Sequence, residues 1–258
     1  MISPLANVSP DAKIGKDVTI MPFAYIEDGV EIGDGCVLMP YVSVMRGTTL
    51  GKNNKVYQHA VLGSEPQDFH YKGGDTRLVI GDGNTIRENV VISRSSHPDG
   101  ESRIGNGNFL MDKVHFCHDV HVGDNCIFGI GTSVAGNCRI DSCTILSTSV
   151  VLNQGVHVGK WALVQGGCRL SKDVPPYIIA AGNPPMYHGV NAYVMQHSDM
   201  MKVSDRILRH IVNAYRLLSQ SNFSVTDALQ KIQDQVPKSD EIVEILHFVE
   251  HSNNGIVR

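Results

Sequence analysis

An aliphatic or aromatic residue returns at every sixth position from Ile104 to Leu170 without a slip in phase. No α-helix has this period, because 3.6 residues per turn would scatter the positions around the axis. A plain strand alternates in twos and seldom runs far beyond ten residues. The period therefore predicts a parallel β-helix, in which short extended segments alternate with turns. The anchor positions are Ile104, Leu110, Phe116, Val122, Phe128, Val134, Ile140, Leu146, Leu152, Val158, Val164 and Leu170.

The same period begins at Ile2 and continues in phase to Leu62. If three sixes make one turn, each coil takes about 18 residues and rises by about 4.8 Å, the spacing between neighbouring strands. Two positions before most anchors stands a small or β-branched residue, as a tight inward corner requires. Among these corner residues are Ala6, Ala12, Val18, Ala24, Val30, Cys36, Val42, Thr48 and Ala60, and later Cys126, Cys138 and Cys168.

The period is interrupted twice, at residues 64–77 and 93–103. An inserted loop leaves a stacked core intact and projects from it, which is where functional residues tend to lie. Tolerated surface insertion is the simpler interpretation of each loop. Ile80, Ile86 and Ile92 restore one coil between the two loops.

The six-residue period stops after Gly182, and apolar residues then recur at the three- and four-residue spacing of helices. We expect a β-helix over residues 1–185 and a C-terminal helical domain over 190–258. The first helix begins near Ser204 or Asp205, the second runs from Ser224 to about Gln235, and the third from Ser239 to His251. These helices are expected to cover the open edge of the last coil; a share in a binding site is the sharper alternative.

Composition excludes several classes of protein. A formal net charge of −4 argues against a nucleic-acid partner. The chain contains no run of about 18 apolar residues, so stable insertion into a membrane is not expected. The N-terminus shows no export signal, and a cytoplasmic protein is therefore expected. The cysteines have no zinc-like spacing, and those on the inward corner are expected to be free, buried thiols.

Chemistry must lie on the outer walls or corners of a β-helix, because the anchors fill the interior. With three sixes per coil, His118 lies one coil from Gly136 and two from Gln154, and Asp119 and His115 are close by. An imidazole, a carboxylate and an accessible backbone N–H are the components of general-base catalysis with an oxyanion donor. An imidazole suits the base role because its ordinary pKa is close to working pH, and a nearby carboxylate can fix its tautomer.

A set of motifs extends over nearly the whole chain, including both loops and the helical end. It comprises Val114-His115-Phe116-Cys117-His118-Asp119, Val134-Ala135-Gly136, Asp173-Val174-Pro175-Pro176-Tyr177, Pro66-Gln67-Asp68, Ile86-Arg87-Glu88, Gly182-Asn183, Gly189-Val190-Asn191, Asn213-Ala214-Tyr215 and Gly255-Ile256-Val257-Arg258. With these motifs the chain resembles the UDP-N-acetylglucosamine O-acyltransferases that begin lipid A synthesis.

The resemblance implies a left-handed β-helix, a homotrimer with active sites between subunits, and transfer of an (R)-3-hydroxyacyl chain from acyl carrier protein to the 3-OH of a UDP-sugar. It implies no metal and no separate cofactor, since the donor is the carrier-bound thioester. His118 matches the catalytic base, Asp119 the carboxylate that orients it, and Gly136 the oxyanion donor. Residues expected to bind substrate are Gln67, Asp68, His70, His115, Gln154, Asn191 and His197.

The chain departs from the family pattern where positive charge is expected. His70 replaces the lysine after the loop aspartate, and the arginine-bearing segment reads Met195-Gln196-His197. Both losses remove charge that could pair with a diphosphate. The favoured interpretation is a divergent enzyme that acts on the usual substrate, in which His70 and His197 take over contacts of the missing lysine and arginine. The alternatives are N-acylation of a 3-amino sugar nucleotide, an acetyl-CoA-dependent transferase of the same repeat, and a non-catalytic β-helix protein.

A γ-class carbonic anhydrase, which uses the same scaffold, is less consistent with the sequence. His115, His118 and His121 would be its zinc ligands, but an alternating strand places His118 on the opposite face from the other two.

Overall fold

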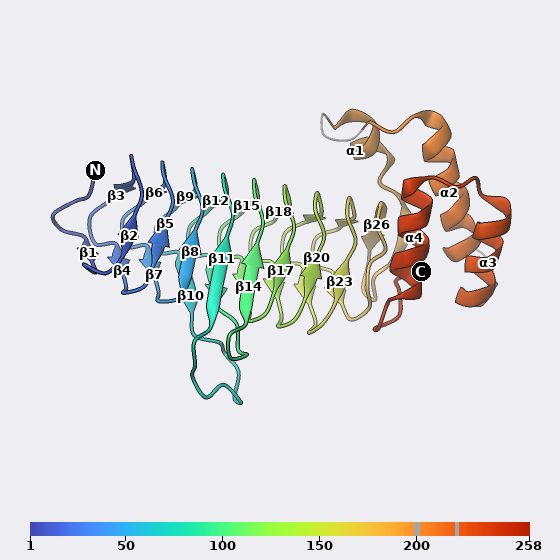
Figure 1. Ribbon diagram of the computed structural model, residues 1–258. Coiled ribbons are helices and arrows are strands. Elements are labelled where there is room, and N and C mark those ends of the chain that lie inside the picture. The colour runs from blue at the N-terminus through green and yellow to red at the C-terminus, as the bar shows by residue number, and fades with distance from the viewer. Residues whose placement is uncertain (199–201, 220–221) are drawn as a thin grey trace.

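The chain folds into a left-handed parallel β-helix with a helical C-terminal end (Figure 1). The computed structural model describes residues 1–198, 202–219 and 222–258. Successive short strands belong to different sheets, so each turn of the chain adds one strand to each of three walls. The handedness agrees with the resemblance and opposes the general preference for right-handed crossovers.

The three sheets run the length of the coil stack. The first contains β1 (Asn7–Val8), β4 (Tyr25–Ile26), β7 (Ser43–Val44), β10 (Val61–Ser64), β13 (Val91–Ser93), β16 (His115–Phe116), β19 (Ser133–Val134), β22 (Val151–Leu152) and β25 (Arg169–Leu170). The second contains β2 (Lys13–Ile14), β5 (Glu31–Ile32), β8 (Thr48–Leu50), β11 (Arg77–Ile80), β14 (Glu101–Ile104), β17 (His121–Val122), β20 (Arg139–Ile140) and β23 (His157–Val158). The third contains β3 (Thr19–Ile20), β6 (Val37–Leu38), β9 (Lys55–Val56), β12 (Thr85–Ile86), β15 (Phe109–Leu110), β18 (Ile127–Phe128), β21 (Ile145–Leu146), β24 (Leu163–Val164), β26 (Ile178–Ala181) and β27 (Met186–Val190).

The strand register confirms that three six-residue repeats make one coil. His115 pairs with Ser133, and Ser133 pairs with Val151, each in parallel. Every predicted anchor from Ile20 to Leu170 is buried, and so are the corner cysteines. The exception is the N-terminal coil, where Ile2 is 49% exposed because no further coil covers it.

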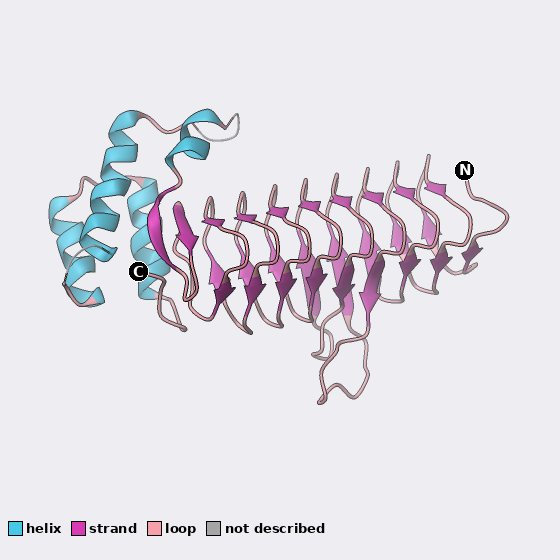
Figure 2. Cartoon of the chain, turned by 180° about the vertical axis from the view of Figure 1, so that it is seen from behind, coloured by secondary structure: helices cyan, strands magenta, loops and turns pink. Residues whose placement is uncertain are grey.

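Both interruptions occur at one corner of the prism, where the chain passes from the first sheet to the second. The first loop leaves β10 and returns at β11, so that Val61 pairs with Val91, a longer step than a regular coil takes. The second leaves β13 and returns at β14, so that Val91 pairs with His115, which is again a longer step. The second loop ends at β14, which begins at Glu101, slightly before the expected boundary at 103. Figures 1 and 2 show both loops projecting together from the middle of the stack.

An inward corner of the coil carries a ladder of buried asparagines that the sequence analysis did not predict. Asn84 donates its backbone N–H and its amide to Asn54 Oδ1, at 2.8 and 2.9 Å. Asn84 Oδ1 in turn accepts the backbone N–H of Asn108 at 2.8 Å, and Asn108 Oδ1 accepts that of Cys126 at 2.7 Å. Each amide thus satisfies the backbone donor of the next coil, which makes polar side chains acceptable in this interior.

The C-terminal end contains more structure than the three expected helices. Those helices are α2 (Asp205–Ser219), α3 (Val225–Gln235) and α4 (Asp240–Glu250). In addition, β27 pairs antiparallel with β26, and a short helix, α1 (Ala192–His197), follows it. The apolar run before Asn191 lacks the six-residue period, which is why the sequence analysis did not find this hairpin.

The helices stand at the C-terminal end of the stack (Figure 2). Buried side chains fasten them to the last coils. The hydroxyl of Tyr215 in α2 donates to the carbonyl of Pro176, and that of Tyr177 donates to Glu244 of α4 at 2.6 Å. Ile256 bridges in parallel to Asp173 beyond α4. The open edge of the β-helix is therefore covered, as expected. Among the described residues, no helix has the length and apolar character that crossing a membrane would need.

Replacing Asn84 by alanine tests the ladder. The change leaves the buried N–H of Asn108 without its acceptor, which should cost roughly 1–3 kcal/mol of unfolding free energy. The midpoint and slope of urea denaturation measure this loss. Asn7→Ala, at an exposed position of β1, is the matched control and should change stability by less than about 0.5 kcal/mol. Equal stability of the two variants would contradict the role of the ladder.

Candidate active site

His118 and Asp119 lie side by side in the connection from β16 to β17, at the corner where the two loops project. The backbone of Asp119 turns this corner with φ of 58°, a left-handed conformation that aspartate tolerates better than most residues. His118 Nδ1 lies 2.8 Å from Asp119 Oδ2. The side chains are only 12% and 10% exposed, respectively. The predicted pair of imidazole and carboxylate is therefore in contact and largely shielded from water.

The second loop surrounds the Asp119 carboxylate with hydrogen-bond donors. The Ser96 hydroxyl donates to Oδ2 at 2.7 Å and the Ser96 N–H at 3.2 Å, while the Ser95 hydroxyl donates to Oδ1. Burial by itself would raise the pKa of Asp119, but the hydrogen bonds from Ser95, Ser96 and His118 outweigh it and lower that pKa below its ordinary value. Asp119 is consequently an anion at neutral pH.

Gly136 lies directly against the imidazole, one coil further along. A Cβ placed on it would be 2.5 Å from Cε1 of His118 and 2.7 Å from Nε2. Only glycine leaves room for the ring in its present position. The Gly136 carbonyl accepts the N–H of Gly155 in the next coil at 3.0 Å. Within the described residues, its N–H has no acceptor in the chain, so it can still donate.

The first loop brings Asp68 to the other ring nitrogen. Asp68 Oδ2 lies 3.9 Å from His118 Nε2, and Asp68 Oδ1 accepts the backbone N–H of His70 at 2.9 Å. Gln67 and His70 are both exposed on either side of Asp68. Phe69, between Asp68 and His70, is fully exposed. Asp68 is thus the residue predicted on this loop that the structure brings to His118.

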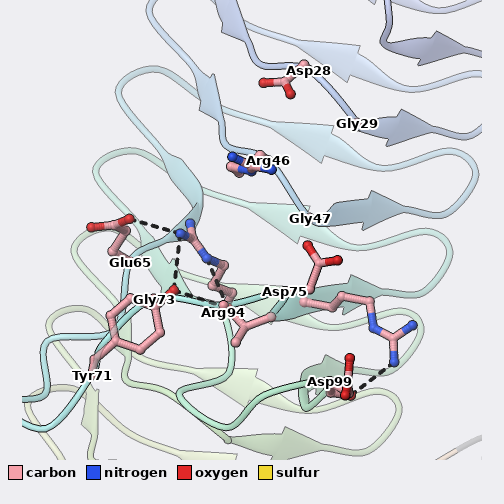
Figure 3. A pocket seen from close by; sticks show the side chains of 13 residues that line it. Asp28, Gly29, Arg46, Gly47, Glu65, Tyr71, Gly73, Asp75, Arg94 and Asp99 are labelled. Atoms are coloured by element: carbon pink, nitrogen blue, oxygen red, sulfur yellow. Dashed lines mark hydrogen bonds and ion pairs between the residues drawn. The ribbon is translucent and has the colours of Figure 1, made fainter.

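Arg94 holds the first loop in place (Figure 3). Its side chain is 6% exposed and donates to the carbonyl of Gly63 at 2.9 Å, to Thr76 Oγ1 at 3.1 Å and to Glu65 Oε1 at 3.1 Å. These partners stand at both ends of the loop. Arg94 also lines a cavity of about 590 Å³, together with Tyr71. The sequence analysis missed this arginine, although it directly follows the strand from which the second loop departs.

Beside the dyad, on the wall of the second sheet, lies an open cleft of about 610 Å³. Asp119 and Asn137 line it at the corner, and His97 of the second loop, His121 and Arg139 line it further out. The cleft therefore combines polar and cationic side chains next to the buried carboxylate. A single chain leaves it open to solvent.

The other predicted site residues lie at varying distances from this corner. His115 faces outward from β16 and is half-buried, and burial lowers the pKa of its imidazole, so it is neutral at neutral pH. Gln154 is exposed in the coil after Gly136. Asn191 and His197 lie at the helical end instead. The Asn191 amide is buried and donates to the Trp161 carbonyl at 3.0 Å, while His197 is exposed and stacks on Tyr193.

The side chains at the corner are not arranged around a metal ion. Across residues 1–198, 202–219 and 222–258, no three or more His, Cys, Asp or Glu side chains gather as metal ligands would. The His118 imidazole at the corner lies between two carboxylates, Asp119 on Nδ1 and Asp68 near Nε2. The exposed imidazole of His97 lies 3.9 Å from Asp119 Oδ2.

Two family models match the chain. The bacterial transferase hexapeptide model (six repeats) matches residues 11–38 and 101–136. The model described as UDP N-acetylglucosamine O-acyltransferase, domain 2, matches residues 173–257. The fold and the corner site thus define a hexapeptide-repeat acyltransferase.

Similar proteins extend over the whole chain. The acyl-[acyl-carrier-protein]–UDP-N-acetylglucosamine O-acyltransferase of Halorhodospira halophila is 38% identical, over 100% of this chain and 99% of its own length. The enzyme of that name from Syntrophobacter fumaroxidans is 33% identical over the same shares. The chain belongs to the family of acyl-[acyl-carrier-protein]–UDP-N-acetylglucosamine O-acyltransferases.

Solved structures agree with this assignment. The UDP-N-acetylglucosamine acyltransferase of Bacteroides fragilis superimposes with a TM-score of 0.96 at 43% identity, covering 100% of both chains. The Arabidopsis enzyme gives 0.85 at 30% identity, also over 100% of both chains.

Substituting Gly136 by alanine tests the contact between this residue and the imidazole. The added Cβ would displace the ring of His118, and a displacement of about 1 Å at a reacting group can cost about 100-fold in rate. We expect kcat/KM for acyl transfer to fall to that extent while the thermal unfolding midpoint stays close to that of the parent. In a His118→Ala background the same substitution should have no further effect. A large additional loss there would show that Gly136 acts independently of His118.

Proposed function

We propose that this protein transfers an (R)-3-hydroxyacyl chain from acyl carrier protein to the 3-OH of UDP-N-acetylglucosamine, with His118 as general base. The observation that carries this proposal is the shielded His118–Asp119 pair packed against Gly136, in a chain of this family. An anionic Asp119 can only accept hydrogen bonds, so His118 Nδ1 carries the hydrogen between them. The lone pair of Nε2 then faces the side where Asp68 and the substrate would lie.

The reaction moves one proton from the sugar hydroxyl to His118 and then from His118 to the leaving sulfur. Nε2 of His118 takes the proton of the sugar 3-OH while the oxygen attacks the thioester carbonyl carbon. The C–S bond then breaks, and the proton held on Nε2 passes to the departing pantetheine sulfur. The products are an ester and a free thiol, and no metal or further cofactor enters the balance. The negative charge that develops on the carbonyl oxygen is stabilised by the unpaired N–H of Gly136.

The substrate-binding residues would come from this corner and from the helical end of the chain. Asp68 and Gln67 would contact the sugar from the first loop, His115 would line the sugar and acyl site, and Gln154 would contact the nucleotide. His70 and His197 would take over contacts that the family makes with lysine and arginine. Asn191, with its amide committed to Trp161, would act on the nucleotide side only through the backbone that it positions.

We propose further that three copies associate, so that the open cleft is closed between neighbouring subunits. The full exposure of Phe69, beside Asp68, supports a second surface against the first loop, because burial of a phenylalanine side chain is favourable. In this arrangement residues 1–185 carry the chemistry and residues 190–258 cover the last coil and face the carrier protein. The free cysteines are consistent with a reducing compartment, and we place the protein in the cytoplasm.

Mass spectrometry of the products tests the proposal. The enzyme is mixed with UDP-N-acetylglucosamine or its 3-amino analogue and with carrier proteins bearing acyl chains of graded length. We expect an ester on the 3-hydroxy sugar, and His118→Ala should lower its rate of formation by about 100- to 10,000-fold with the assembly unchanged.

The matched control is His188→Ala, at an exposed position of β27, which should retain the parent rate. Amide formation with the 3-amino analogue in preference to the ester would assign the altered acceptor instead. Full activity of His118→Ala would contradict the role of His118 as the base.

A further inference from the structure

Several donors hold both oxygens of the Asp119 carboxylate, and most of them come from the second loop. Oδ2 receives Ser96 Oγ at 2.7 Å, Ser96 N at 3.2 Å and His118 Nδ1 at 2.8 Å. Oδ1 receives the Ser95 hydroxyl. The backbone N–H of Asp119 donates to Ser102 Oγ at 2.9 Å, just after the same loop. The second loop thus holds the side chain of Asp119, and Ser102 of β14 holds its main chain.

The direction of these hydrogen bonds is determined by the surroundings. Ser95 Oγ accepts the N–H of His97 at 3.1 Å. Its hydrogen has two acceptors within reach, and Asp119 Oδ1 is much the nearer, since the His97 carbonyl lies 3.4 Å away. An ionised carboxylate has acceptor sites only, and the serine donors occupy positions on both oxygens. Rotation of the carboxylate away from His118 would therefore break bonds on both oxygens. Without these bonds, a carboxylate on a convex corner would be free to turn toward water.

The loop itself is shaped to bring these hydroxyls inward. Gly100 packs so closely that a Cβ at this position would lie 2.3 Å from Ser95 Oγ. Ser95 is fully buried and Ser96 is half-buried. Arg94, the residue before them, is buried and fastened to the first loop. One short segment therefore secures the first loop on one side and Asp119 on the other.

We propose that Ser95 and Ser96 are positioning residues for the acyl transfer, which hold the Asp119 carboxylate in the orientation that fixes the tautomer and direction of His118. They do not reach the substrate; they act through Asp119 on the Nε2 lone pair. The inference rests on the proposed function, since it assumes that His118 is the base. It assigns a purpose to the second interruption of the repeat, which supplies both hydroxyls.

Ser96→Ala is the primary test, because it removes one hydroxyl and keeps the backbone N–H that also binds Oδ2. We expect kcat to fall about 10- to 100-fold, while KM for the sugar nucleotide changes by less than about twofold, because the residue does not contact substrate. Ser96→Thr, which keeps the hydroxyl, should restore kcat. In an Asp119→Ala background, Ser96→Ala should have no additional effect.

Ser64→Ala is the matched control. Its hydroxyl hydrogen-bonds to Ser93 at 3.0 Å near the base of the loops and does not touch Asp119, so kcat should be unchanged. If Ser96→Ala lowers the thermal midpoint enough to impair folding, Ser95→Ala, which removes the donor on Oδ1, takes its place with the same expectations. Ser95→Thr then serves as the rescue variant.

The outcomes separate the two proposals. If His118→Ala keeps its activity, the proposed function fails and the inference fails with it. If His118 is essential but Ser96→Ala has the parent kcat, only the inference is overturned. A rise in KM with unchanged kcat would also overturn it, because it would show that Ser96 acts on substrate binding rather than on the base. A loss of kcat that Ser96→Thr does not restore would show that the hydroxyl is not the group that matters.

Discussion

The structure depends on the fixed coil length that parallel strand pairing imposes on the chain. Backbone N–H groups of one coil donate to carbonyls of the next, as between His115 and Thr132 at 2.9 Å. The buried anchors prevent slippage, because a shift by one residue would turn every anchor toward water. Residues at equivalent positions of consecutive coils are therefore neighbours in space. The contact between His118 and Gly136 follows directly from this step, without any special folding of the site.

The fixed coil length also allows two irregular loops to be inserted at the site. Both loops enter at the corner that bears His118, and the register resumes behind each of them. Because the core does not change, the loops can take conformations that the repeat itself would not allow. The first contributes Asp68 and the second contributes the donors to Asp119. The rigid stack sets the distance between the His118 imidazole and the backbone of Gly136, and the irregular loops set the electrostatics around them.

What is periodic could be predicted from the sequence. The buried anchors, the coil length, the position of both loops and the alignment of His118 with Gly136 all follow from counting residues. The asparagine ladder was missed, because Asn54, Asn84 and Asn108 occupy a corner at which small residues are expected. Their burial is acceptable only through bonds between coils, which no local pattern reveals. Arg94, Ser95 and Ser96 were missed for a related reason: loop conformation is set by specific side-chain bonds. The hairpin of β26 and β27 lies where the six-residue period has ended.

The corner of a β-helix is convex, and this shape limits what one chain can do with it. A carboxylate and an imidazole at such a place would normally be solvated, which weakens the interaction between them. Here the second loop shields Asp119 and the first approaches His118, so that both side chains are about nine-tenths buried. The wall beyond Asp119 and Arg139 remains open, and the exposed Phe69 adjoins the loop residue that reaches His118. Transfer of an acyl chain needs that wall closed against water. The chemistry that we propose for the corner and the apolar side chain on the neighbouring loop therefore both favour the proposed association, in which a second protein surface completes the cleft.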